Sequence, residues 1–295
     1  MAAAPALATE RLPVLRNMRN PDCATVRSAG APGQAPWRVG AANVVRGRPG
    51  FGTVQGVPVD PVGFWGIPTA SIDWCEQNYA LTPWVAEFWN TISSLAMVAA
   101  GLLGLSTRRF ARELRIAFGL LVLVGVGSIA FHGTLRFELQ MLDELPMLYL
   151  VTWLVWLLVE TGPRRRLGAW VPALLIGYVL LATAGASLNR GDAQFLAFHV
   201  SFGALELFCL GRVTWIALRP ENRSVRVHFA VGLAAYAFGI AIWFVDLRAC
   251  PWVSVALPAH GIPNPQLHAW WHVLVSIGFF LLLSVVSFDR LRRRT

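Results

Sequence analysis

The segment His268-Ala-Trp-Trp-His272 opens an apolar run that extends from Val273 to Phe288 without a charged residue. Together, this segment and the apolar run reach the ~20 residues that a helix needs to cross the hydrocarbon core of a bilayer. Two histidines four positions apart lie on the same face of such a helix. Ionisable side chains at membrane depth cost about 3 kcal/mol each on insertion scales, so this pair indicates a functional site.

Six further segments have the length and hydropathy of membrane-spanning helices. They are Trp84–Leu105, Leu114–His132, Leu142–Val159, Ala169–Ala186, Ala193–Leu218 and Val227–Val245. The composition agrees, because 56% hydrophobic and 14% charged residues make a chain far more apolar than a soluble domain. A large soluble helical core would need polar helix faces, which these segments lack. We therefore expect an all-α membrane protein, a bundle of seven transmembrane helices.

The placement of arginine predicts the orientation of this bundle. All 25 basic residues are arginine, and the connections after the second, fourth and sixth segments hold only Arg136, Arg190 and Arg248. The positive-inside rule then places the carboxyl terminus in the cytoplasm and the amino terminus in a lumen or outside the cell. The connections after the first, third, fifth and seventh segments hold Arg108, Arg109, Arg112, Arg115, Arg164, Arg165, Arg166, Arg219, Arg223, Arg226, Arg290, Arg292, Arg293 and Arg294.

The net charge of +9 follows from these arginines. We expect it to reflect topology and lipid contact, with no nucleic-acid partner, since no basic stripe carries interleaved aromatic residues.

Changes in composition divide the chain into four parts. Residues 1–57 are rich in Ala, Pro, Gly and Arg, and we expect a disordered basic extension. Residues 58–83 form an acidic loop outside the membrane, residues 84–288 the seven-helix transmembrane domain, and residues 289–295 a short basic cytoplasmic tail.

Five polar residues are predicted to meet at one membrane depth. Ser128 and His132 end the second segment, Asp143 begins the third, and His268 and His272 begin the seventh, so the arginine topology places all five in the non-cytoplasmic leaflet. Three histidines can bind Zn²⁺ and leave a fourth position open for water, as in hydrolytic sites. Zinc lowers the pKa of such a water to ~7 and polarises a carbonyl group.

We therefore expect a metal site inside the bundle near its non-cytoplasmic side. Asp143 is the candidate general base, and Ser128 is placed to donate to a developing oxyanion.

Four other polar residues lie within the apolar segments. His199, Glu206 and Arg212 are interpreted as an interhelical pairing network, with His199 as a reserve metal ligand. Asp246 either orients a ligand imidazole or caps its helix, and the first interpretation is slightly favoured.

The acidic loop before the first segment contains a second candidate site. Asp73, Glu76 and Asn78 fall at offsets that no single helix face brings together, whereas a tight loop around a cation can. Carboxylate, amide and carbonyl oxygens are the ligands of calcium, and Glu87 could add another from the first turn of a helix that Thr82-Pro83 begins. A solvated acidic loop that caps a helix fits this spacing equally well.

Three cysteines of the loop and the helices have different expected roles. Cys75 and Cys250 both lie on the non-cytoplasmic side of the predicted topology, where a disulfide is chemically allowed. Such a bond would tie the acidic loop to the start of the last helix. Cys209 lies in the middle of a segment and is interpreted as an inert apolar filler.

Five motifs together resemble the alkaline ceramidases, seven-helix zinc amidases of intracellular membranes. They are Asp73-Trp-Cys-Glu-Gln-Asn-Tyr79, Ala86-Glu-Phe-Trp-Asn-Thr-Ile-Ser93, Ser128-x-x-Phe-His132, Leu142-Asp-Glu-Leu-Pro-Met147 and His268-Ala-Trp-Trp-His272. They occur in the order of the family and cover about Gly63 to Phe288. The long amino-terminal extension and the very short carboxyl-terminal tail depart from the animal members.

The resemblance implies a role for each motif residue. It implies that the histidines bind zinc, that Asp143 and Ser128 serve the chemistry, and that Cys75 and Cys250 form a disulfide. The calcium ligands that it implies are Asp73, Trp74 through its carbonyl, Glu76, Asn78 and Glu87.

The implied reaction is hydrolysis of the N-acyl bond of ceramide, a lipid of the bilayer, to a sphingoid base and a fatty acid. Calcium would tune the activity, and no obligate protein partner is implied. The compartment would be the ER or Golgi membrane in a eukaryote and the inner membrane in a bacterium.

Two other functions remain alternatives. One is a seven-helix receptor or scaffold with structural zinc, for which an open coordination position beside Asp143 and Ser128 has no use. The other is an acyltransferase or lipid-remodelling enzyme of the same wider superfamily, which includes the adiponectin-receptor-like proteins. It would share the histidines but should not need the loop from Asp73 to Asn78.

Overall fold

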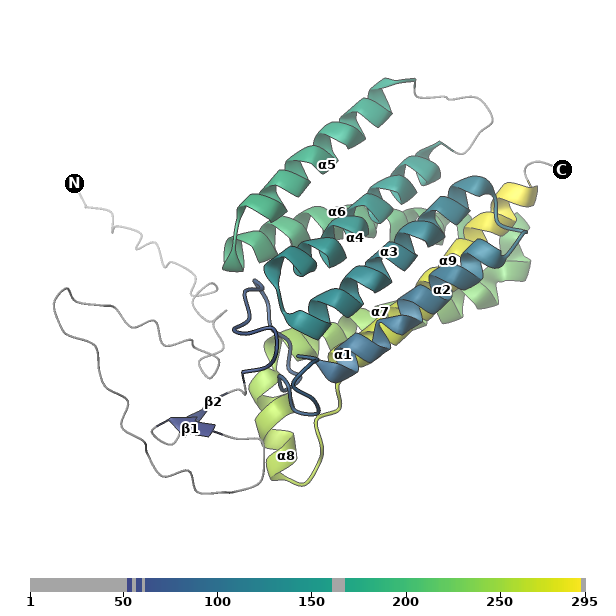
Figure 1. Cartoon of the computed structure of the whole chain (residues 1–295). Coiled ribbons are helices and arrows are strands. Elements are labelled where there is room, and N and C mark those ends of the chain that lie inside the picture. Colours follow the sequence, from purple (N-terminus) through teal and green to yellow (C-terminus); the bar gives the residue numbers. More distant parts are fainter. Residues whose placement is uncertain (1–51, 55–56, 60–61, 161–167, 293–295) are drawn as a thin grey trace, which may run out of the picture. The chain divides into compact units, whose positions relative to one another are not determined.

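The computed structural model describes residues 52–54, 57–59, 62–160 and 168–292, and it is dominated by helices (Figure 1). Within these residues, seven helical segments are long and apolar enough to cross a membrane, which confirms the predicted fold class. They are α1 (Phe88–Ser93) with α2 (Leu95–Ser106), α3 (Arg112–Thr134), α4 (Phe137–Val159), α5 (Trp170–Leu188), α6 (Gly191–Leu218), η1 (Pro220–Val225) with α7 (Arg226–Arg248), and α9 (Leu267–Arg292).

The remaining elements are short. A π-helical turn, η2 (Trp252–Ala256), and α8 (Leu257–Ala259) connect α7 to α9. Strands β1 (Gly52–Val54) and β2 (Val57–Val59) pair antiparallel, a hairpin that the expected disorder of residues 1–57 did not anticipate. Arg164, Arg165, Arg166, Arg293 and Arg294, which carry part of the predicted orientation, lie outside the described residues, as does Cys23.

The long helices lie side by side along one common direction, with α5 at an outer edge (Figure 1). Helix α3 packs between α2 and α4, α7 packs along α9, and α5 contacts α4 and α6. The main apolar core includes Leu114 and Phe118 of α3, Leu157 of α4 and Val285 of α9, all fully buried. Large apolar side chains such as Leu181 and Leu207 point outward, as expected of helices that face lipid.

Helices α3 and α4 approach most closely beside two of the candidate site residues. A Cβ atom added at Gly127 would overlap the backbone carbonyl of Leu142, so only glycine permits this distance. Pro146, four residues after Leu142, offers no N–H to that carbonyl. Because Gly127 precedes Ser128 and Leu142 precedes Asp143, this contact brings Ser128 and Asp143 to the same place.

The first span begins later than the sequence predicts. Thr82-Pro83 does not begin a helix, and Glu87 is the extended residue before α1 and not part of its first turn. The reason is tertiary, because the N–H groups of Ala86 and Glu87 donate to the carbonyls of Gly133 (3.0 Å) and His132 (2.9 Å) at the end of α3. This pairing holds Ala86 and Glu87 outside the helix, so α1 begins at Phe88. The third span, in contrast, begins earlier than predicted, at Phe137 in place of Leu142.

The loop formed by residues 62–87 is fixed to the same end of the bundle. The N–H groups of Thr69 and Ala70 both donate to the carbonyl of Leu135 at 3.0 Å, in the short connection between α3 and α4. Asn264, just before α9, donates to the carbonyl of Cys75 at 2.7 Å. The loop therefore lies against the end of the bundle where α3 ends and where α4 and α9 begin.

Candidate functional site

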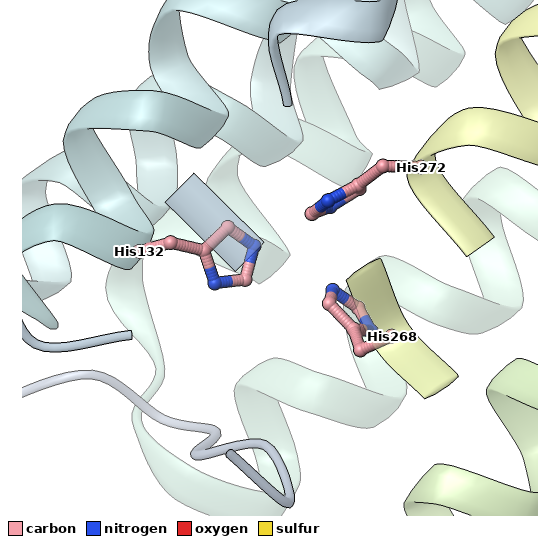
Figure 2. A group of neighbouring side chains, drawn as sticks. All are labelled: His132, His268 and His272. Atoms are coloured by element: carbon pink, nitrogen blue, oxygen red, sulfur yellow. The ribbon is translucent and has the colours of Figure 1, made fainter. Parts of the chain in front are cut away.

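Three buried histidines from two distant parts of the chain meet inside the bundle. His132 lies in the last turn of α3, and His268 and His272 lie in the first two turns of α9. One ring nitrogen of each lies within 4.8 Å of those of the other two, and each residue is at most 3% exposed. Figure 2 shows the three rings pointing toward one another, His132 from one side and the pair from the other. These residues could hold a metal ion.

Two of the three imidazoles have one nitrogen fixed by a hydrogen bond. His132 Nδ1 is hydrogen-bonded to the carboxyl of Glu87, and His272 Nδ1 to the hydroxyl of Ser93 at 2.8 Å. Metal-binding histidines are usually held in this way through the nitrogen that does not bind the metal. Both partners come from the start of the first span, so this segment orients ligands carried by α3 and α9.

The third imidazole differs from the other two. His268 Nδ1, the counterpart of the atoms held in His132 and His272, is buried and has no hydrogen-bond partner among the described residues. The fit to a metal ion therefore rests on the donor set itself. Three imidazole ligands form a common metal site that leaves one position open, and three buried imidazoles fit a metal ion such as zinc.

Ser128 and Asp143 lie beside the histidines. Ser128 Oγ is 3.5 Å from His272 Nε2, and its side chain is hydrogen-bonded to the carboxyl of Asp143. Ser94 Oγ lies 3.0 Å from Ser128 Oγ. Both Ser128 and Asp143 are buried, so their hydrogen bonds are shielded from water. The structure thus brings together the five residues that the sequence predicted to share one membrane depth.

The sequence analysis missed three residues of this site. Ser93 holds His272, Ser94 contacts Ser128, and the amide of Asn90 donates to Glu87 at 3.2 Å. A signal was present, because Asn90, Ser93 and Ser94 are polar residues inside an otherwise apolar span. Glu87 was assigned to calcium alone, yet its carboxyl also contacts a metal-site histidine.

The predicted calcium residues cluster in the loop beside α1. Asn78 donates to the carboxylate of Asp73 at 3.0 Å, and the N–H of Trp74 donates to Glu87 at 3.1 Å. The Oδ1 atom of Asn78 is buried without a hydrogen-bond partner. Carboxylate and amide oxygens are calcium ligands, so the orphaned oxygen and its acidic neighbours fit a cation.

The electrostatics of this loop also favour a positive charge. Burial raises the pKa of Glu87 to about 8; the hydrogen bond from Asn90 lowers it and the nearby charge of Glu76 raises it further. Burial likewise raises the pKa of Glu76. A cation among these groups would stabilise their ionised forms.

Glu76 shows that the helix-capping alternative is also realised. Its carboxylate accepts hydrogen bonds from the N–H groups of Trp89 at 2.7 Å and Asn90 at 2.9 Å, in the first turn of α1. These N–H groups have no partner inside the helix, so the carboxylate caps it.

Of two sequence predictions about buried polar residues, one was wrong and the other was confirmed in part. The carboxylate of Asp246 accepts from the backbone N–H groups of Cys75 at 3.2 Å and of His268, and it does not hold an imidazole. His199, Glu206 and Arg212 do pair between helices or locally, but not with one another. Their partners are the carbonyl of Phe195, the hydroxyl of Tyr236 and the carbonyl of Leu158, respectively.

The cysteines lie as the sequence analysis expected. Cys75 and Cys250 are joined as a disulfide with their Cα atoms 5.2 Å apart, an ordinary separation for such a bond. The bond connects the acidic loop to the residues that follow α7. Cys209 is buried and free.

Comparison with known proteins identifies relatives over most of the chain. The family model for Ceramidase matches residues 66–295, a range that contains every candidate site residue above. Alkaline ceramidase 3 of Mus musculus is 32% identical over 243 residues, which cover 79% of this chain and 88% of that protein. Alkaline ceramidase YPC1 of Saccharomyces cerevisiae is 31% identical over 255 residues, 78% of this chain and 79% of that protein. Alkaline ceramidase of Arabidopsis thaliana is 29% identical over 235 residues, 78% and 88% of the two chains.

Proposed function

This chain belongs to the ceramidase family, and from that premise we propose that it is a zinc-dependent amidase acting within the membrane. It hydrolyses the N-acyl bond of ceramide to a sphingoid base and a free fatty acid. The observation that carries the proposal is the buried group of His132, His268 and His272, with Ser128 and Asp143 in contact beside it.

Each residue of this group has a distinct part in the reaction. The three histidines would hold zinc, which polarises an amide carbonyl and lowers the pKa of water to ~7. Asp143 accepts a proton from the attacking water and delivers it to the leaving nitrogen as the carbon–nitrogen bond breaks. Ser128 donates to the carbonyl oxygen while negative charge develops there. The Gly127 contact between α3 and α4 keeps the last two residues together.

The position of the site suits a lipid substrate. The histidines lie within spans α3 and α9, whose outward faces are apolar. A ceramide molecule could therefore present its amide group to the site while its acyl chain stays among lipid chains.

Purified protein incubated with N-acyl sphingoid bases tests the proposal. Wild type should release fatty acid and contain bound zinc. His268→Ala should lose both zinc and activity, whereas Asp143→Asn should keep its zinc and lose about 10²- to 10⁴-fold in turnover. His260→Ala, which changes an exposed histidine outside the site, is the matched control and should behave as wild type.

The outcomes also separate the alternative functions. A wild-type protein that binds zinc and releases no fatty acid would favour a receptor or scaffold with structural zinc. Transfer of the acyl group to an added acceptor, in place of water, would favour an acyltransferase.

We further propose that calcium bound by Asp73, Trp74, Glu76, Asn78 and Glu87 regulates this activity. What supports it is the orphaned oxygen of Asn78, whose amide donates to the carboxylate of Asp73, and the contact of Glu87 with both the loop and His132. Calcium there would fix the loop and, through Glu87, the orientation of His132. It would not take part in the chemistry.

Calcium titration of turnover tests this second proposal. Wild-type turnover should rise with added calcium, and Asp73→Asn should need about 10-fold more calcium because one charged ligand is lost. Asp192→Asn, an exposed aspartate at the start of α6, is the control and should respond like wild type. Equal turnover with a calcium-selective chelator and with added calcium would count against regulation.

A further inference from the structure

The three metal-site histidines are not held in the same way. Glu87 holds His132 and Ser93 holds His272, each through Nδ1. His268 Nδ1 has no hydrogen-bond partner among the described residues, and the carboxylate nearest its backbone, Asp246, bonds only to main-chain N–H groups. Something other than a hydrogen bond must therefore set the direction of the His268 ring.

Aromatic rings provide that contact. The indole of Trp74 stacks on the imidazole of His268 with ring centroids 3.7 Å apart and 21° between the planes. Trp271, one turn along α9, lies nearly parallel to the same imidazole at 5.0 Å and 26°. Trp271 is carried by the same helix as His268, whereas Trp74 comes from the acidic loop. His132 on α3 approaches the same imidazole at 5.1 Å but tilted by 56°, so Trp74 is the ring that stacks on His268 from outside its own helix.

The backbone around Trp74 is fixed on both sides. Its N–H donates to Glu87, the carboxyl that also holds His132. The next residue, Cys75, is tied by its disulfide to Cys250 and by its N–H to Asp246, which also accepts from the N–H of His268. Tryptophan has only two side-chain torsions, so an indole on such a backbone is a rigid surface.

We propose that Trp74 is a positioning residue, whose indole ring holds the imidazole of His268 toward the other two histidines in place of a hydrogen bond. The inference rests on the proposed function for its metal ion and extends it to the loop. Its role is separate from that of the Trp74 carbonyl, because any side chain at this position keeps the carbonyl. Contacts that orient a metal ligand typically alter metal affinity or activity by 10- to 100-fold.

Substitutions of Trp74 that remove or keep the aromatic ring test the proposal. In Trp74→Leu and Trp74→Met an apolar side chain remains but is smaller and has no stacking face, whereas Trp74→Phe keeps an aromatic face. Zinc release into a chelator is followed for each purified protein, together with kcat and KM for ceramide. Replacement of zinc by cobalt adds a visible absorption spectrum that reports the geometry of the ligands.

We expect the two variants without an aromatic ring to release zinc about 10-fold faster than wild type. Their cobalt spectra should shift, and kcat should fall while KM changes little. Trp74→Phe should lie much closer to wild type in all three measurements. Trp270→Leu removes an exposed tryptophan from the same helix, with no ring contact to His268, and should release zinc as wild type does.

The results distinguish failure of the positioning role of Trp74 from failure of the proposed function. If Trp74→Leu or Trp74→Met folds, keeps the wild-type rate of zinc release and keeps the wild-type cobalt spectrum, the stacking contact has no positioning role. If zinc release accelerates as expected but wild type never hydrolyses ceramide, the positioning role stands and the proposed activity fails. Faster release in Trp74→Phe equal to that in Trp74→Leu would also contradict the proposal, because the aromatic face would then not matter.

Discussion

At the scale of single residues, the site is assembled from ligands and from the groups that orient them, and the two sets come from different places. The ligands lie on α3 and α9. Their orienting contacts, Glu87, Ser93 and the ring of Trp74, all lie between the acidic loop and the end of α1. The loop and the first turns of the first span are thus part of the candidate metal site, although they supply none of its three histidines.

The contact between Ser93 and His272 predicts a measurable loss of metal. Ser93→Ala removes the hydroxyl that bonds to His272 Nδ1 at 2.8 Å, so the imidazole is less constrained. We expect zinc affinity to fall by about 10-fold, with a smaller change in stability. Ser106→Ala, an exposed serine at the other end of the same span, is the control. Unchanged zinc affinity in a competition titration would show that Ser93 does not orient the ligand.

The sequence predicted the cluster of three histidines better than the partners of their side chains, for a physical reason. The spacing of His268 and His272 on one helix face is a local property, and histidines at membrane depth are rare enough to be noticed. The partner of a buried carboxyl depends on where distant segments lie. Asp246 could have held an imidazole, but the acidic loop places the N–H of Cys75 within its reach. Glu87 reaches His132 only because its backbone pairs with the end of α3.

At the scale of helices, the contact between α3 and α4 is the one on which the proposed chemistry depends. Gly127 lets the two backbones touch at Leu142, next to the pair formed by Ser128 and Asp143. A similar contact joins α7 to α9, where a Cβ at Gly278 would lie 2.9 Å from the carbonyl of Gly232. Small residues at such places are the usual means by which membrane helices pack closely.

Gly127→Ala should therefore damage both stability and activity. The added methyl would overlap the Leu142 carbonyl, and backbone atoms cannot turn away as a side chain can. We expect a loss of about 1–3 kcal/mol in unfolding free energy and a large fall in turnover, because Ser128 and Asp143 separate. Thermal unfolding and fatty-acid release measure the two effects.

Gly119→Ala on the same helix is the matched control. A Cβ there would meet only a side-chain carbon of Leu105 at 3.9 Å, an ordinary contact. Because alanine favours helix, this variant should be as stable as wild type or slightly more so. A Gly127→Ala protein that matches it in stability and turnover would contradict the importance of the close approach.

Helix boundaries show where hydropathy stops being informative. The apolar pattern that predicts the first span begins at Trp84, but the Trp84 side chain is 60% exposed and the residue lies outside the helix. Aromatic residues near a membrane surface raise the hydropathy of a segment whether or not they are helical. The non-helical backbone of Ala86 and Glu87 follows from long-range hydrogen bonds to Gly133 and His132, which no local pattern reports.

At the scale of the whole described bundle, hydropathy predicts the seven spans. It does not predict which spans pack against one another. Each span satisfies its own backbone hydrogen bonds, as a bilayer requires, so a local stretch of sequence is enough to predict it. The packing of α9 against both α2 and α7 depends on the surfaces of three helices, and the pattern of apolar residues is too uniform to specify it. Beyond the spans, the placement of arginine also predicts their direction across the membrane, and this stays a prediction.

That direction gives a prediction about the side of the membrane on which the site lies. His132 ends the second span and His268 begins the seventh, so both lie on the side opposite the cytoplasmic carboxyl terminus if the positive-inside rule holds. The pairing of Cys75 with Cys250 at the same end agrees, because disulfides persist in oxidising compartments.

For a protein expressed in a bacterial inner membrane, green fluorescent protein fused after Thr295 should fluoresce. The same reporter fused after Leu188, at the end of the fourth span, should stay dark, and alkaline phosphatase at the two positions should give the opposite pattern. Fluorescence after Leu188 and none after Thr295 would place the histidines at the cytoplasmic face and would require the arginines to have been misinterpreted.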